Sequence, residues 1–92
     1  MKFEKYLNEA IDSKSRRQFL MSIDNFPKGK MKMKVNGNDV DIKGDGKSVS
    51  FTYPEDAIEI TSALVSIVDS IQARSFDYND KNKKITFIVK GM

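Results

Sequence analysis

Apolar residues recur at helical spacing near the start of the chain, where they predict two helical pieces. Residues 2–12 carry one apolar stripe, made of Phe3, Leu7, Ala10 and Ile11, with Tyr6 at its edge. Ser15 and Gln18 have the spacing of a capping box, so a second helix is predicted to begin at Ser15. Its inward positions are Phe19, Leu20 and Ile23. Pro27 cannot continue a helix, so this second helix is predicted to end before it.

The pattern then changes to strict alternation, which predicts a strand over residues 30–35. Its Met and Val side chains face one side and its three lysines face the other. Asn36-Gly37 follows, and this dipeptide favours a two-residue hairpin turn because both central residues need positive φ. The turn predicts the pairs Met33 with Val40, Met31 with Ile42, Lys34 with Asp39, and Lys32 with Asp41. A turn at Gly37-Asn38 has the same parity, so that version stays open.

A second turn dipeptide, Asp45-Gly46, predicts a third strand over residues 47–53. The predicted pairs are Ile42 with Val49 and Val40 with Phe51, and the inward side chains of the new strand are Val49, Phe51 and Tyr53. The three strands therefore form an antiparallel meander.

A long amphipathic helix is predicted to begin at Pro54 and to end near Arg74. Pro54, Glu55 and Asp56 suit a first helical turn, because proline is tolerated there and acids interact favourably with the helix dipole. The apolar face consists of Ala57, Ile60, Leu64, Ile67, Val68 and Ile71, widened by Ile58 and Val65. The polar side carries Glu59, Ser62, Ser66, Asp69 and Gln72.

Two further alternating segments, at residues 76–79 and 85–90, predict a C-terminal hairpin. A turn at Lys81-Asn82 would pair Tyr78 with Ile85 and Phe76 with Phe87. The complete pattern predicts one α+β domain over residues 1–92, with an N-terminal helix or two short helices, the three-stranded meander, the long helix and the hairpin. One antiparallel sheet packs on the helices, while the order of its strands and the oligomeric state stay open.

The amino-acid composition limits the kinds of catalytic and metal-binding site that the chain can form. The chain has no Cys, His or Trp, which excludes disulfides, Cys/His zinc sites, and a histidine general base. Asp39, Asp41 and Asp45 do not fit a calcium loop, because Lys43 and Ser50 occupy ligand positions. The glycines Gly37, Gly44 and Gly46 are expected in hairpin turns rather than in a nucleotide-binding loop. Composition leaves a Ser-Lys dyad open, yet we expect a non-enzymatic protein with no metal and no cofactor.

Positive charge is concentrated in one segment. The chain has 16 basic and 13 acidic residues, a net charge of +3. Residues 14–34 contain one acid, Asp24, and the basic residues Lys14, Arg16, Arg17, Lys28, Lys30, Lys32 and Lys34. Such a segment is either a solvated face or a contact surface for nucleic acid or an acidic protein. Binding of single strands also needs exposed aromatic platforms, whereas Phe51, Tyr53, Phe76, Tyr78 and Phe87 all fall at inward positions.

The first ten residues, Met1 to Ala10, carry a further signal. They resemble the capsid-targeting peptide of internal head proteins in T-even-like tailed phages. Such peptides begin Met-Lys, form a short amphipathic helix and end at a prohead-protease site of the form Leu or Ile, any residue, Glu, small residue. Leu7, Glu9 and Ala10 fit this site, and no other stretch does. The other interpretation is that these residues form the first turns of a helix that packs on the sheet.

The resemblance implies cleavage after Glu9, which would leave residues 10–92 as the mature body. It implies packaging in the capsid interior and delivery to the host cytoplasm, where the protein would inhibit a host protein such as a defence nuclease. The expected partner is thus a host or phage protein, with at most weak DNA contact.

No apolar run approaches the roughly 18 residues of a membrane span. The alternatives are a nucleic-acid-binding accessory module that uses residues 14–34, or a cytoplasmic protein-interaction domain.

Overall fold

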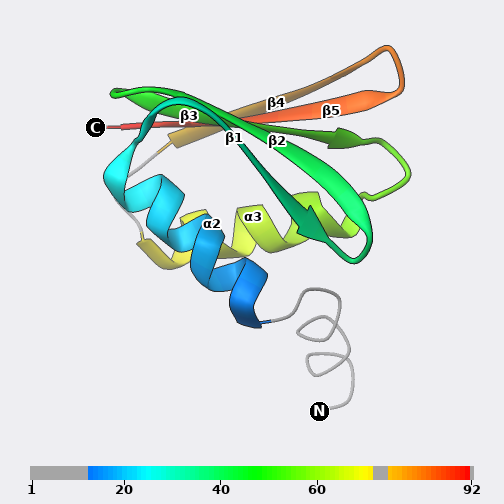
Figure 1. Cartoon of the computed structure of the whole chain (residues 1–92), viewed down its shortest axis with the longest axis horizontal. Helices are drawn as coiled ribbons and strands as arrows, with labels where there is room; N and C mark the ends of the chain where they lie inside the picture. Colours follow the sequence, from blue (N-terminus) through cyan, green and yellow to red (C-terminus); the bar gives the residue numbers. More distant parts are fainter. Residues whose placement is uncertain (1–12, 72–74, 92) are drawn as a thin grey trace.

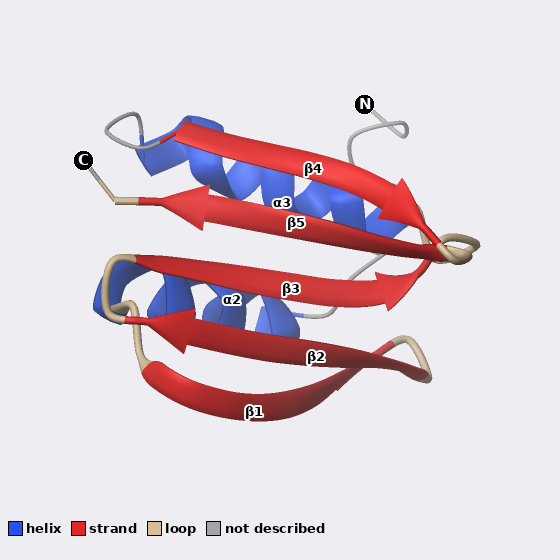
Figure 2. Ribbon diagram, turned by 90° about the horizontal axis from the view of Figure 1, so that it is seen from above, coloured by secondary structure: helices blue, strands red, loops and turns tan. Residues whose placement is uncertain are grey.

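The computed structural model describes residues 13–71 and 75–91, which form a sheet with two helices on one of its faces (Figures 1 and 2). In chain order the elements are α2 (Ser13–Asn25), β1 (Lys28–Val35), β2 (Asn38–Asp45), β3 (Ser48–Pro54), α3 (Glu59–Ile71), β4 (Ser75–Lys81) and β5 (Lys84–Lys90). The α+β class, the meander and the C-terminal hairpin are thus confirmed. The helix predicted at residues 2–12 lies outside the described residues.

The five strands form one antiparallel sheet in the order β1-β2-β3-β5-β4. The C-terminal hairpin joins the meander through β5, which lies beside β3, so that β1 and β4 are the two edge strands. Figure 2 shows α2 beside the meander and α3 beside the hairpin, on the same face. Neither of the two described helices covers the opposite face of the sheet.

The core lies between the sheet and the two helices. The inward residues of β2, β3 and β5 are almost completely buried, as the alternation predicted; they include Val40, Ile42, Val49, Phe51, Tyr53, Ile85, Phe87 and Val89. Phe19 of α2 packs edge-to-face on Phe51, with ring centroids 5.2 Å apart. From α3, Ile60, Leu64, Ile67 and Val68 join the same cluster. The predicted faces of both helices are therefore confirmed at these positions.

The first hairpin has the predicted register. Asn36 and Gly37 both have positive φ, at 53° and 82°. Met33 lies opposite Val40, Met31 opposite Ile42, Lys34 opposite Asp39 and Lys32 opposite Asp41. A two-residue turn at Asn36-Gly37 therefore fixes the β1–β2 ladder.

The second turn lies one residue later than predicted. Gly44 is opposite Val49 and Ile42 is opposite Phe51, so Gly44 lies inside β2 rather than in a turn. The cause is the Asp45 side chain, whose Oδ1 accepts hydrogen bonds from the backbone N–H groups of Lys47 and Ser48, both at 2.8 Å. Asp45 thus stands before the turn, and Gly46 takes the positive φ of 90°.

The third turn is shifted in the same way. Its central residues are Asn82 and Lys83, with φ of 57° and 62°, rather than Lys81 and Asn82. Asparagine adopts positive φ more readily than lysine, which favours Asn82 as the first central residue. The pairs are consequently Tyr78 with Phe87 and Phe76 with Val89. Phe76 still stacks on Phe87 along the diagonal, with ring centroids 4.8 Å apart.

Both described helices begin away from the predicted residue. Ser15 lies inside α2 and is buried, so α2 does not begin at Ser15. Pro54 is the last residue of β3, where it pairs with Lys84, and α3 begins at Glu59. A backbone turn, in which the N–H of Ala57 donates to the carbonyl of Pro54, separates the strand from the helix. Ile58 therefore precedes the helix and is 63% exposed, so its predicted place on the apolar face is wrong.

Candidate functional site

The face of the sheet opposite α2 and α3 is the candidate site, and we call it the outer face. It is formed by the even-numbered residues of β1, β3 and β5 and the odd-numbered residues of β2 and β4, because side chains alternate between the two faces. Its lysines are Lys28, Lys30, Lys32, Lys34, Lys43, Lys81, Lys84 and Lys90. Its acids are Asp39, Asp41, Asp45 and Asp77. The outer face therefore has an excess of positive charge and no aromatic side chain.

Most of the β1–β2 ladder on this face pairs a lysine with an aspartate. Lys28 is opposite Asp45, Lys32 opposite Asp41, and Lys34 opposite Asp39. The Lys34 Nζ and Asp39 Oδ1 atoms are 3.8 Å apart, and both side chains are largely exposed. One pair breaks this pattern, because Lys30 stands opposite Lys43. Like charges directly opposite each other in a sheet are unfavourable.

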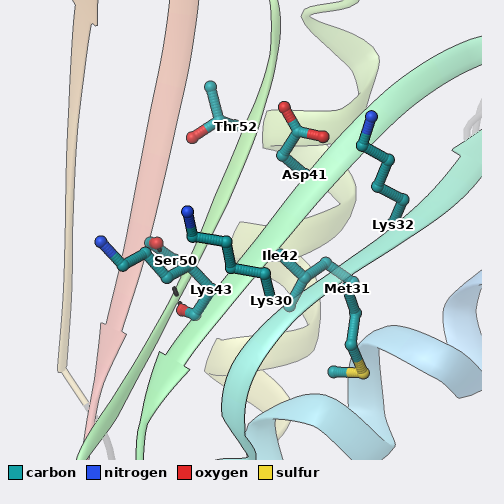
Figure 3. A pocket seen from close by; sticks show the side chains of 8 residues that line it. All are labelled: Lys30, Met31, Lys32, Asp41, Ile42, Lys43, Ser50 and Thr52. Atoms are coloured by element: carbon teal, nitrogen blue, oxygen red, sulfur yellow. Dashed lines mark hydrogen bonds between the residues drawn. The ribbon is translucent and has the colours of Figure 1, made fainter.

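An open hollow of about 530 Å³ lies at this break. It is lined from three neighbouring strands by Lys30, Met31, Lys32, Asp41, Ile42, Lys43, Ser50 and Thr52. In Figure 3 the Lys30 and Lys43 side chains extend to the same side of the sheet, whereas Met31 points toward α2. Within the part of the chain that the structure describes, Lys30, Lys32 and Lys43 form no ion pair.

Hydroxyl side chains of β3 and β5 lie on the outer face beside the hollow. The Ser50 hydroxyl donates to the carbonyl of Lys43 at 3.3 Å. Thr52 and Thr86 share one hydrogen bond between their hydroxyl oxygens, also at 3.3 Å. Only one of the two threonine protons is used in that bond, so the other hydroxyl can donate to an anion above the sheet. The lysines and threonines together form a surface suited to carboxylate or phosphate groups.

Asp45 on the outer face and Tyr53 on the opposite, inner face both have a shifted pKa. The backbone N–H groups of Lys47 and Ser48 lower the pKa of Asp45, which keeps this carboxylate charged at one end of the outer face. On the inner face, burial raises the pKa of Tyr53 to about 12. The Tyr53 hydroxyl lies 2.5 Å from the Thr61 hydroxyl and serves the packing of α3 on the sheet.

The structure divides the basic segment at residues 14–34 between two surfaces. Lys28, Lys30, Lys32 and Lys34 gather on the outer face. Lys14, Arg16 and Arg17 are exposed on α2, which packs on the inner face. The segment therefore does not form one patch.

The basic segment predicted at residues 14–34 does not include Lys43, which comes from the next strand. Extending the predicted register by one pair places Lys43 opposite Lys30, as the structure shows, so the signal lay in the cross-strand pairing. The predicted processing residues Leu7, Glu9 and Ala10 lie outside the described residues.

The described residues also bear on metal binding and membrane spanning. Over residues 13–71 and 75–91, no cluster of three or more His, Cys, Asp or Glu side chains could hold a metal ion. The described helices include none that is long and apolar enough to cross a membrane. Phe51, Tyr53 and Phe87 are buried on the inner face, and the exposed Tyr78 lies on the same side of the sheet. The outer face consequently offers ammonium, hydroxyl and carboxylate groups for binding.

Comparison of the chain with protein-family models, with curated proteins and with solved structures gave no significant match.

Proposed function

We propose that this chain is a non-enzymatic binding protein whose outer face contacts an acidic surface of a protein partner. The observation that carries the proposal is the excess of lysine over aspartate on the outer face. The interspersed aspartates favour a protein over a nucleic acid, because they would repel phosphates but can pair with cations on a protein surface. The lack of aromatic platforms on this face also disfavours single-stranded nucleic acid.

Two variants with the same change in charge test this proposal. Lys30, Lys32 and Lys34 are replaced by Gln in one variant, and Lys14, Arg16 and Arg17 in the other. We expect the β1 variant to weaken binding of poly-L-glutamate by about tenfold or more at about 0.1 M salt, since it removes direct contacts. The α2 variant should change the affinity by less than about threefold, because it removes only distant charge. Isothermal titration calorimetry provides the measurement, and equal losses in both variants would contradict the proposal.

The same β1 variant tests nucleic-acid binding. If the three lysines contacted phosphates, the log–log plot of DNA affinity against salt would have a slope near −0.9 per phosphate, and the variant would flatten it by about three at most. We expect little DNA affinity at physiological salt, because Asp39 and Asp41 stand opposite two of these lysines. A clear band shift with duplex DNA that is lost in the variant would instead support the nucleic-acid alternative.

We further propose that the partner is a host protein such as a defence nuclease, which the chain inhibits by covering part of its surface. This proposal rests on the resemblance of residues 1–10 to the targeting peptide of phage internal head proteins. All described helices and strands follow the site between Glu9 and Ala10, so cleavage there would leave these elements intact. Packaging in the capsid and delivery to the host cytoplasm follow from the same resemblance.

Processing at Glu9 is directly measurable. Co-expression with a prohead protease of this type should remove nine residues, and intact-mass spectrometry should show the mature chain beginning at Ala10. The Glu9→Gln variant should remain uncut, because the protease reads the glutamate, whereas Glu4→Gln should be cut normally. Equal cleavage of Glu9→Gln and the parent chain would refute the site, and no cleavage of the parent chain would refute the phage assignment.

A further inference from the structure

The Lys30–Lys43 pair is placed where the sheet would be more stable with opposite charges. Its neighbours on the β1–β2 ladder are Lys28–Asp45, Lys32–Asp41 and Lys34–Asp39, which all pair opposite charges. Directly opposed side chains in an antiparallel sheet have Cβ atoms about 4.5–5.5 Å apart, so the two lysines interact unfavourably. Within the β1–β2 ladder this is the one like-charged pair on the outer face, and a broken local rule with no structural gain beside it is typical of a functional site.

The surroundings of this pair suit one anion. The two ammonium groups belong to flexible side chains and provide donors without an acceptor of their own. The hollow beside them is lined by Lys32 and Thr52 as well, and its carboxylate, Asp41, stands opposite Lys32. An anion seated between Lys30 and Lys43 would therefore remove the repulsion between them and find further donors nearby.

We infer that the Lys30–Lys43 pair is the anchor of the interface, where one carboxylate of an acidic protein partner sits between the two ammonium groups. This inference rests on the proposed function and names the part of the outer face that contributes most to affinity. Carboxylate is the favoured occupant because the surface as a whole mixes cations with aspartates and lacks aromatic side chains. Charge-assisted hydrogen bonds from both lysines would hold it.

The matched control for this anchor is a second pair of lysines on the same face. Lys81 lies opposite Lys84 beside the β4–β5 turn, outside the hollow. Lys30→Gln, Lys43→Gln and Lys81→Gln each remove one positive charge from an opposed lysine pair. Titration with poly-L-glutamate at about 0.1 M salt should show affinity losses of about three- to tenfold for the first two variants and less than about twofold for Lys81→Gln.

A fourth variant separates binding from folding. Lys43→Glu would give Lys30 an acidic partner and extend the pattern of the neighbouring pairs. It should raise the urea midpoint while weakening poly-L-glutamate binding by about tenfold or more. Retained affinity in Lys43→Glu would overturn the anchor.

Two outcomes distinguish this inference from the proposed function. If Lys30→Gln and Lys43→Gln weaken binding no more than Lys81→Gln, while the triple β1 variant still weakens it strongly, the anchor is wrong and the outer face remains the interface. If the two single variants weaken duplex DNA binding but leave poly-L-glutamate binding unchanged, the occupant is a phosphate and the assignment to a protein carboxylate is wrong.

Discussion

Replacing Ile67 with Ala should lower the free energy of unfolding by about 2–5 kcal/mol. Ile67 is completely buried in α3, within the cluster that joins both helices to the sheet. The substitution removes apolar contacts and leaves a cavity, because the surrounding side chains can only partly close the space. Urea unfolding at constant pH measures the change. A domain of this size has a total stability of about 5–15 kcal/mol, so the loss is a large fraction of it.

Ser66→Ala is the matched control for this measurement. Ser66 precedes Ile67 in the same helix but is exposed. Its replacement should change the free energy of unfolding by less than about 0.5 kcal/mol, because no buried contact is lost. If Ser66→Ala and Ile67→Ala were equally destabilising, the orientation of α3 on the sheet would be wrong.

Gly44→Ala should be the second strongly destabilising change, by about 1–3 kcal/mol or more. A Cβ atom at Gly44 would lie 1.8 Å from the carbonyl oxygen of Pro27, which is far inside any acceptable contact. The clash cannot be relieved by rotating a side chain, because the obstacle is backbone between α2 and β1. The adjoining pair, Gly29 with Gly44, ties this backbone to β2. Chemical unfolding of the variant measures the loss.

Gly37→Asn provides the comparison for Gly44→Ala. A Cβ atom at Gly37 meets no atom within 4 Å, and only its φ of 82° disfavours a side chain. Asparagine adopts this conformation more readily than most residues, so the cost should stay below about 1 kcal/mol. An equally small effect of Gly44→Ala would mean that the Pro27 carbonyl does not approach β2 this closely.

The alternation of apolar and polar residues predicted the two faces of the sheet better than it predicted the strand pairing. A two-residue turn that moves by one position shifts the cross-strand partners by two residues, which leaves every side chain on the same face. Val49 and Phe87 are therefore buried as expected, although their partners differ from the predicted ones. The shift at Asp45 depends on side-chain hydrogen bonds to the backbone, which a dipeptide preference does not include.

The candidate site was predictable only in part, for a similar reason. The lysines of β1 were evident as a row at every second position. Cross-strand pairing brings Lys43 beside the β1 lysines. Arg16 and Arg17 lie apart from these lysines because α2 packs on the opposite face of the sheet. The number of charged residues in a sequence segment cannot distinguish these arrangements, because residues 14–34 include a helix and a strand that expose different surfaces.

The most direct test of the outer face as the interface is an NMR titration of the ¹⁵N-labelled full chain with poly-L-glutamate at about 0.1 M salt. Amide shift changes are expected to concentrate at Lys30, Lys43, Ser50 and Thr52, and to be small along α2, because the contact surface lies on the opposite side of the sheet. Shift changes centred on Lys14, Arg16 and Arg17, or an absence of shifts from the outer face at saturation, would contradict the account.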